Sequence, residues 1–182
     1  HLGLKLWLES GGHSRILTPS AFKTWSDQMS LAEGDKAPDF NMTTDAGGSV
    51  SLADLKGRPV VLYFYPKNDT PGCTTEACGF RDLEADFSSV DATVIGVSRD
   101  SVKRHDKFKA KYDLNFALGS DEDGVVTEAY GVWVEKMNYG RSYMGIERST
   151  FLIDGTGAIA KIWRKVRVKG HVDAVLEATK AL

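Results

Sequence analysis

Hydrophobic positions along the chain follow two alternating patterns from about residue 35 onward. Continuous runs of β-branched and aromatic residues indicate buried strands, and apolar residues spaced by three or four positions indicate helices. The predicted strands are Val60–Tyr65, Thr93–Ser98, Asn115–Leu118, Thr150–Ile153 and Ala158–Trp163. The predicted helices are a segment carrying Ala77, Phe80, Leu83 and Phe87, followed by Ser101–Tyr112, Val125–Tyr130 and Val172–Leu182.

Glycines mark the connections late in the chain. Gly131 closes the third predicted helix, and the stretch between it and Thr150 is expected to be an irregular loop. Asp154-Gly155-Thr156-Gly157 predicts a hairpin turn, because glycine readily adopts a positive φ. The last two strands are therefore expected to pair antiparallel.

The predicted strands and helices alternate along the chain, which ends in a hairpin and a helix. This order predicts an α/β protein. We expect a central mixed β-sheet, parallel inside with an antiparallel edge, flanked by helices on both faces. This is the plan of a thioredoxin-like fold. Sites in such sheets tend to form beyond the carboxyl ends of the strands, where the segment after Tyr65 is expected to lie.

Composition narrows the possible functions. The 182 residues, with 42% hydrophobic and 26% charged residues, suit one globular domain. A net charge of −2 gives no overall attraction to nucleic acid or to a membrane surface, and no apolar run approaches the roughly 18 residues of a spanning helix. The two cysteines are too few for a disulfide scaffold, so we expect a reducing compartment, the cytoplasm.

No cofactor or metal is expected. The four histidines are scattered and pair with neither cysteine at a spacing typical of metal ligands. Asp121-Glu122-Asp123-Gly124 lacks the downstream ligands of a calcium loop and is expected to be a solvated turn. A glycine-rich phosphate-binding loop is also missing from the sequence.

Residues 1–28 differ from the rest of the chain. The sequence opens with His1, has a cluster at Ser10-Gly11-Gly12 and reaches its first methionine at Met29. We interpret residues 1–28 as a non-native extension and expect the domain to span residues 29–182. A targeting segment is the alternative, although transit peptides are rich in arginine and poor in acidic residues, whereas this stretch has only Arg15 and two acidic residues.

Candidate chemistry is concentrated in one turn, where Thr70-Pro71-Gly72-Cys73 follows the strand that ends at Tyr65. Thr70 is suited to the N-cap of a helix and Pro71 to its first position, so Cys73 is expected in the first turn. Free backbone N–H groups and the positive end of the helix dipole favour a thiolate there, and the thiolate is the reactive form of cysteine. A lone helical cysteine is more often a small buried hydrophobe, but this placement favours a nucleophile.

The five-residue spacing between Cys73 and Cys78 limits how the two thiols can combine. In an intact helix their Cα atoms would be ~8.7 Å apart, from the rise and radius of the helix. A disulfide requires less than about 7 Å. A bond between the two therefore requires the helix to unwind, and two unrelated thiols remain the alternative.

The sequence around these cysteines resembles the active-site signature of the peroxiredoxins, Pro-x-x-x-Thr-x-x-Cys, and specifically that of the bacterioferritin-comigratory or Q type. The matching run extends from Tyr65 to Asp82, and the resemblance covers about Leu31 to Leu182. It includes Gly34–Phe40 near the start and Arg148–Asp154 late in the chain. This resemblance implies a thioredoxin-like thiol peroxidase that reduces hydrogen peroxide and organic hydroperoxides in antioxidant defence.

The resemblance also implies a role for each site residue. Cys73 would be the peroxidatic cysteine, oxidised by peroxide to a sulfenic acid, and Cys78 the resolving cysteine that forms an intramolecular disulfide with it. Thr70 would hydrogen-bond the thiolate and the peroxide, and Pro66 would shield the site from water. Arg148 would favour the thiolate and stabilise the polarised O–O bond.

The resemblance further implies a monomer whose disulfide is reopened by thioredoxin, or alternatively by a glutaredoxin. Glu76 could bond Arg148 or the helix start, although a solvated carboxylate that complements the helix dipole is as compatible with its position. Thr70 could be only a helix cap, and an isolated arginine such as Arg148 is usually a surface charge. A disulfide reductase with the same thiols, or a chaperone on a thioredoxin-like scaffold, are the alternative functions.

Overall fold

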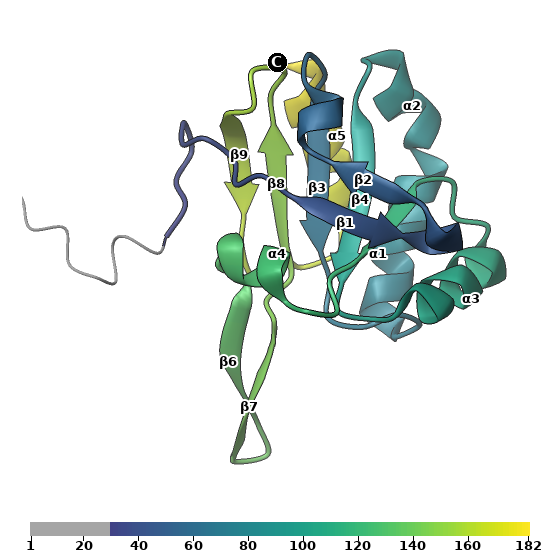
Figure 1. Cartoon of the computed structure of the whole chain (residues 1–182), viewed down its shortest axis with the longest axis vertical. Helices are drawn as coiled ribbons and strands as arrows, with labels where there is room; N and C mark the ends of the chain where they lie inside the picture. Colours follow the sequence, from purple (N-terminus) through teal and green to yellow (C-terminus); the bar gives the residue numbers. More distant parts are fainter. Residues whose placement is uncertain (1–29) are drawn as a thin grey trace, which may run out of the picture.

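The strand β3 (Val60–Phe64) lies inside the sheet and has all five residues buried. The computed structural model describes residues 30–182, so the predicted extension 1–28 lies outside the described residues. Within this range a seven-stranded sheet has the order β2-β1-β5-β4-β3-β8-β9. Figure 1 shows this sheet with helices packed against it and with a separate two-stranded hairpin extending from one end.

The sheet is parallel at its centre and antiparallel at both sides. β3 pairs parallel with β4 (Thr93–Ser98), which pairs parallel with β5 (Ala117–Ser120). β8 (Ser149–Ile153) and β9 (Ile159–Trp163) continue the sheet antiparallel beyond β3. On the other side β5 pairs antiparallel with β1 (Asn41–Thr44), which pairs with β2 (Ser49–Ser51).

Residues 30–182 contain five α-helices and two short 3-10 helices. The α-helices are α1 (Pro71–Asp82), α2 (Glu84–Ser89), α3 (Val102–Tyr112), α4 (Val125–Ala129) and α5 (His171–Lys180). The 3-10 helices are η2 (Asp45–Gly47) and η3 (Ala53–Leu55). None of the helices in residues 30–182 has the length and apolar character needed to cross a membrane.

Alternate residues of β3 face two different parts of the hydrophobic core, because successive strand side chains point to opposite faces. Val61 and Tyr63 belong to a cluster that also holds side chains of α1, α2, α3 and α5. Leu62 and Phe64 belong to a second cluster that holds α4 and the segment before β1. Helices thus cover both faces, and the predicted thioredoxin-like α/β fold with a mixed sheet is confirmed.

Three local predictions differ from the structure. The stretch expected to be an irregular loop forms a hairpin of β6 (Trp133–Asn138) and β7 (Arg141–Ile146), which pair only with each other. Its residues are mostly exposed on both faces, so they carry no apolar alternation that would mark a strand. The hairpin turn at Tyr139 and Gly140 has positive φ at both residues, as a two-residue turn of this type requires.

The helix predicted around Phe80 and Phe87 is two helices. Leu83, with φ −102° and ψ 7°, separates α1 from α2. A single non-helical residue leaves the three- and four-residue spacing of apolar positions unchanged, so the pattern could not reveal the break. The third predicted strand lies two residues later than expected, because pairing continues through Gly119 and Ser120 after the apolar run ends. The strands β1 and β2 were not predicted.

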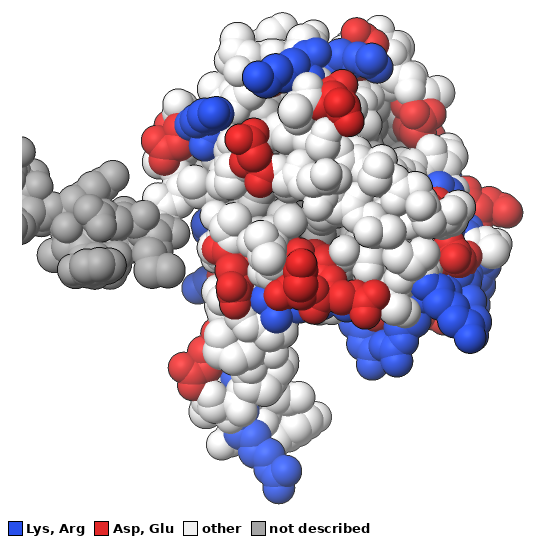
Figure 2. Space-filling view, in the orientation of Figure 1, with Lys and Arg blue, Asp and Glu red and all other residues white. Residues whose placement is uncertain are grey.

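The charged side chains are unevenly distributed over the surface. Lys and Arg side chains gather over α3, whereas acidic side chains gather between α3 and α4 (Figure 2). α3 nevertheless has a buried side, where His105 and Phe108 are almost fully enclosed. The small net charge therefore hides a basic surface beside the loop that precedes α1.

Candidate active site

The segment between β3 and α1 places Cys73 at the carboxyl end of a central strand. Thr70 occupies the N-cap position with an extended backbone, and Pro71 begins the helix. Thr74 N–H donates to Thr70 O over 2.8 Å, closing the first turn around Cys73. Cys73 is 1% exposed and lies in the first turn of α1, where backbone N–H groups have no partner within the helix.

Arg148 and Glu76 form a charged group around this sulfur. Arg148 Nη2 donates to Cys73 Sγ over 3.2 Å, and Nη1 donates to Glu76 Oε1 over 2.8 Å. The Arg148 side chain is 16% exposed and that of Glu76 is fully buried. One guanidinium thus joins the thiol to a buried carboxylate, and its charge favours the thiolate.

Burial of the charged Glu76 carboxylate is energetically unfavourable. Burial raises its pKa from 4.5 to about 7, against the opposing effect of the Arg148 charge. Its second oxygen, Oε2, has no hydrogen-bond partner among residues 30–182, and neither has the buried hydroxyl of Tyr63. The expected contact of Glu76 with Arg148 is therefore present, while the solvated alternative is wrong.

Gly72 leaves the space that Arg148 occupies. A Cβ atom at this position would lie 3.2 Å from Arg148 Nη2, which is closer than nearly all real Cβ contacts. The glycine before the cysteine thus permits the guanidinium to reach Cys73. The sequence drew attention to the cysteine and the arginine but did not reveal this role of Gly72.

Thr70 was expected to hydrogen-bond the Cys73 thiolate, and Pro66 to shield the site from water. Their arrangement in the structure differs from both expectations. The Thr70 hydroxyl donates to Lys67 O over 2.9 Å, and its side chain forms no capping hydrogen bond to the helix. Its oxygen keeps the capacity to accept a hydrogen bond, but its proton is not directed at Cys73. Pro66 is exposed and lines the edge of a surface hollow next to the site.

The loop before α1 is anchored to α3 and to the end of β4. Tyr65 OH donates to Asn68 Oδ1 over 2.6 Å, and the Asn68 amide donates to His105 Nδ1 over 3.0 Å. The Asn68 backbone N–H donates to Asp100 Oδ2 over 2.9 Å. At the next residue, Asp69 has a φ of 57° and accepts hydrogen bonds from Lys111 and Tyr112 of α3. This network, missed by the sequence patterns, fixes the loop that carries Pro66 and Thr70.

Cys78 is a free, partly buried thiol, and Cys73 is likewise free. Both lie in α1, which is continuous from Pro71 to Asp82. Helix geometry therefore keeps their Cα atoms ~8.7 Å apart, beyond the reach of a disulfide. The structure thus has the arrangement of the dithiol form, in which no bond joins the two residues.

A second buried titratable group is His171, the first residue of α5. His171 Nε2 is 2.8 Å from Thr150 Oγ1, and the imidazole packs edge-on against Trp163. Burial, followed by the charge of Arg148, lowers the pKa of His171 from 6.5 to about 4. His171 is therefore neutral at pH 7.

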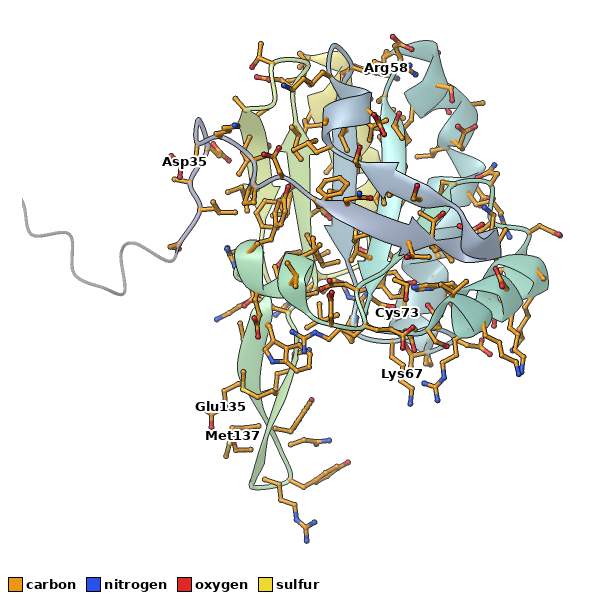
Figure 3. The ribbon with its side chains drawn as sticks, in the orientation of Figure 1. Asp35, Arg58, Lys67, Cys73, Glu135 and Met137 are labelled. Carbon is orange, nitrogen blue, oxygen red and sulfur yellow. The ribbon has the colours of Figure 1, made fainter. Side chains whose placement is uncertain are left out.

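The β6–β7 hairpin borders a surface hollow of about 360 Å³ next to the site, which we call the hairpin hollow. The Arg99 guanidinium lies 3.4 Å from the centre of the Trp133 ring at its wall. In Figure 3 the labelled Cys73 lies close to Lys67, on the same side of the hairpin. The residues that line it include Pro66, Lys67, Trp133, Lys136, Tyr143 and Met144, together with the charged side chains of Arg99, Asp100 and Arg104.

Comparison with known proteins gives a consistent match. Residues 33–162 match the model of the AhpC/TSA family. The chain is 53% identical over 152 residues to peroxiredoxin Bcp of Bacillus subtilis, covering 84% of this chain and 97% of that protein.

Two solved structures are similar as well. The bacterioferritin comigratory protein of Xanthomonas campestris, a protein with alkyl peroxide reduction activity, is 46% identical with a TM-score of 0.75, covering 78% of this chain and 90% of that chain. Peroxiredoxin Q of Xylella fastidiosa is 42% identical with a TM-score of 0.79, covering 83% of this chain and 96% of that chain.

Proposed function

Because the chain belongs to the AhpC/TSA family and, as a peroxiredoxin of the Bcp or Q type, is a thiol-dependent peroxidase, we propose that Cys73 is its peroxidatic cysteine and Cys78 its resolving cysteine. One contact supports this assignment above all others. Arg148 Nη2 donates to Cys73 Sγ over 3.2 Å at the start of α1, whereas no comparable cation is bonded to Cys78 among the described residues.

The first half of the reaction takes place at Cys73. Its thiolate attacks the terminal oxygen of a hydroperoxide, the O–O bond breaks, and Cys73 becomes a sulfenic acid while water or an alcohol leaves. Arg148 favours the thiolate and stabilises the negative charge that develops on the departing oxygen. Glu76 positions the Arg148 guanidinium through its 2.8 Å contact.

Thr70 and Pro66 have supporting roles at the peroxide. The Thr70 hydroxyl donates to Lys67 O, so its oxygen accepts the hydrogen bond of the incoming peroxide O–H. This role agrees with the observed direction of the hydroxyl better than donation to the thiolate does. Pro66 bounds the hairpin hollow and limits the access of water on that side.

The second half of the reaction regenerates the dithiol. The Cys78 thiol condenses with the Cys73 sulfenic acid, releasing water and forming an intramolecular disulfide after α1 unwinds locally. A dithiol protein then reopens the disulfide by thiol–disulfide exchange, and thioredoxin is the donor that we propose, with glutaredoxin as the alternative.

We place this activity in the cytoplasm, where the enzyme works as a monomer in antioxidant defence. The two free cysteines suit a reducing compartment. Residues 29–182 form the catalytic domain, because the described segment already ties its first residues to β9, with Gly34 N–H donating to Ile159 O over 2.8 Å.

Stoichiometric titration of the reduced protein with hydrogen peroxide tests the proposal. The wild type should lose both thiols per equivalent of peroxide and give a Cys73–Cys78 disulfide by mass spectrometry. Cys73→Ser should consume no peroxide, and Cys78→Ser should stop at a sulfenic or over-oxidised Cys73. If Cys73→Ser reacts like the wild type, or if Cys73 stays reduced in Cys78→Ser, the assignment is wrong.

A further inference from the structure

The peptide group between Lys67 and Asn68 is hydrogen-bonded on both of its edges. Its carbonyl oxygen, Lys67 O, accepts a hydrogen bond from the Thr70 hydroxyl over 2.9 Å. Its N–H donates to Asp100 Oδ2, also over 2.9 Å. The peptide bond is trans, so the group is planar and its N–H and C=O point in opposite directions. An interaction that fixes the N–H edge therefore also fixes the carbonyl that meets Thr70.

The direction of the Thr70 hydroxyl depends on this one carbonyl. Among residues 30–182 the hydroxyl forms no other hydrogen bond, and it does not cap α1. A hydroxyl has one proton and two lone pairs, so a proton held by Lys67 O leaves the lone pairs for an incoming donor. Thr70 directly precedes the helical turn that holds Cys73, and the labelled Lys67 lies close to Cys73 in Figure 3. The Lys67 carbonyl thus sets which way the Thr70 oxygen faces at the site.

Asp100 is a firmly held acceptor for the other edge of the peptide group. Its side chain is 6% exposed and lies just beyond β4, where Tyr65 N–H also joins the end of β3 to Val97 O over 3.1 Å. Oδ2 accepts a second hydrogen bond, over 2.7 Å, from the hydroxyl of the fully buried Ser98. Oδ1 lies 3.5 Å from the Arg104 guanidinium. The carboxylate is therefore tied to the central sheet and to α3.

The Asn68 side chain is held separately and leaves its backbone N–H to Asp100. Asn68 Oδ1 accepts from Tyr65 OH over 2.6 Å, and the Asn68 amide donates to His105 Nδ1 over 3.0 Å. His105 Nε2 lies 3.1 Å from Gly119 O. Because a carbonyl can only accept, the proton of the neutral imidazole is on Nε2, and Nδ1 is free to accept from Asn68. Among the described residues, Asp100 alone accepts from the Asn68 backbone N–H.

Building on the proposed role of Thr70, we propose that Asp100 is a positioning residue for the peroxidase reaction, which holds the Lys67–Asn68 peptide group so that the Thr70 oxygen accepts the peroxide O–H. Without an acceptor at position 100, the Asn68 N–H would be unpaired, and the peptide group would turn to reach water. The Lys67 carbonyl would turn with it and release the Thr70 proton. Asp100 acts through its acceptor oxygen, not through its charge.

A double-mutant cycle with Thr70 tests this role, with the rate constant for single-turnover oxidation of Cys73 by hydrogen peroxide as the readout. Thr70→Val removes the hydroxyl but no helix cap, and it should slow oxidation about tenfold, the scale of one hydrogen bond. Asp100→Ala should slow it by a comparable factor. The double variant should stay about tenfold slow instead of about a hundredfold, because both changes remove the same interaction.

Two milder variants separate the acceptor from the charge and from folding. Asp100→Asn keeps an oxygen that can accept from the Asn68 N–H and the Ser98 hydroxyl, so it should react at nearly the wild-type rate. Ser98→Ala removes one of the two hydrogen bonds to Asp100 Oδ2. It should give a smaller loss, which disappears in the Thr70→Val background, and it keeps the test available if Asp100→Ala does not fold.

Asp45→Ala is the matched control. The Asp45 side chain is 11% exposed, accepts one backbone N–H from Leu118 and pairs with Lys109 of α3, but it has no partner in the loop before α1. This variant should lose stability in urea and still react with peroxide like the wild type.

Three results would each overturn the role of Asp100. They are an unchanged rate in Asp100→Ala, losses in a double variant that multiply, and a slow Asp100→Asn. A Thr70→Val variant that reacts like the wild type would refute the proposed role of Thr70 and this inference with it. A wild-type protein that hydrogen peroxide does not oxidise would instead refute the proposed peroxidase site itself.

Discussion

At the scale of single residues, Gly72 controls how closely Arg148 approaches Cys73. In Gly72→Ala the added methyl group would lie 3.2 Å from Arg148 Nη2 and displace the guanidinium by a few tenths of an ångström. Cys73 should therefore lose part of its hydrogen bond from Arg148. Its oxidation by hydrogen peroxide should slow about fivefold, which corresponds to part of a charge-assisted hydrogen bond of roughly 1.5–3 kcal/mol. Single-turnover oxidation by hydrogen peroxide measures this effect.

Gly79→Ala is the matched control in the same helix. There the added methyl group would meet Val172 Cγ2 of α5 at 3.0 Å and lies against no site residue. The stability of this variant should change while its rate of oxidation by hydrogen peroxide stays that of the wild type. Equal oxidation rates in Gly72→Ala and the wild type would show that Arg148 has another route to Cys73.

The sequence reveals the role of a residue when that role depends on its neighbours along the chain. Cys73 was identified from its own neighbours, because Thr70 and Pro71 mark a helix start. Arg148 and Glu76 are 72 positions apart, so their pairing followed only from a resemblance to a known family. Asp100 and His171 gave no signal, since their hydrogen bonds and their burial arise only when distant segments pack together.

At the scale of secondary-structure elements, the proposed reaction requires α1 to change between its two halves. Its intact form holds Cys73 and Cys78 too far apart to bond, so the disulfide form requires residues between them to leave the helix. After one equivalent of peroxide, backbone amides from Cys73 to Asp82 should exchange with deuterium faster than in the dithiol form. Amides of α2, beyond the break at Leu83, and of α5 should keep their protection.

Cys78→Ser gives the comparison for this exchange experiment. It stops at the sulfenic acid, so α1 should stay protected after the same peroxide treatment. Protection of α1 that persists in wild-type protein with the disulfide formed would contradict the unwinding step.

Elements with one well-buried face were predictable, and the others were not. β3 and β4 are continuous apolar runs and were placed to within one residue. β6 and β7 are mostly exposed and gave no pattern, although they carry one wall of the hairpin hollow. β1 and β2 are short and only partly buried, so their place in the sheet depends on pairing with β5 rather than on their own sequence.

At the scale of the whole molecule, two buried groups beside Arg148 act on folding stability with opposite signs. The pKa of Glu76 is raised from 4.5 to about 7 in the folded state, so the stability linked to its proton is complete below pH 4.5 and is lost as pH rises to 7. The pKa of His171 is lowered from 6.5 to about 4, so stability is complete above pH 6.5 and is lost as pH falls to 4. Between pH 4.5 and 6.5 the two effects largely cancel.

Variants that remove one of the two groups should therefore reveal the pH dependence of the unfolding free energy that the other group causes. Relative to wild type, the unfolding free energy of Glu76→Gln should rise by up to about 3 kcal/mol between pH 4.5 and 7. Relative to wild type, that of His171→Gln should fall by a similar amount between pH 4 and 6.5. Urea unfolding of the dithiol form across this range measures both. Parallel pH profiles for wild type and either variant would contradict the corresponding burial effect.

The break at Leu83 has a consequence for how the enzyme responds to the dose of oxidant. Because α2 begins at Glu84, unwinding of α1 does not have to extend into it, and the energy barrier involves about one short helix. In the proposed reaction, the sulfenic acid on Cys73 remains open to a second peroxide while that helix stays folded, and this second peroxide would convert it irreversibly to a sulfinic acid. The opening rate of α1 thus competes with the peroxide concentration and sets the level of oxidant at which the enzyme inactivates itself.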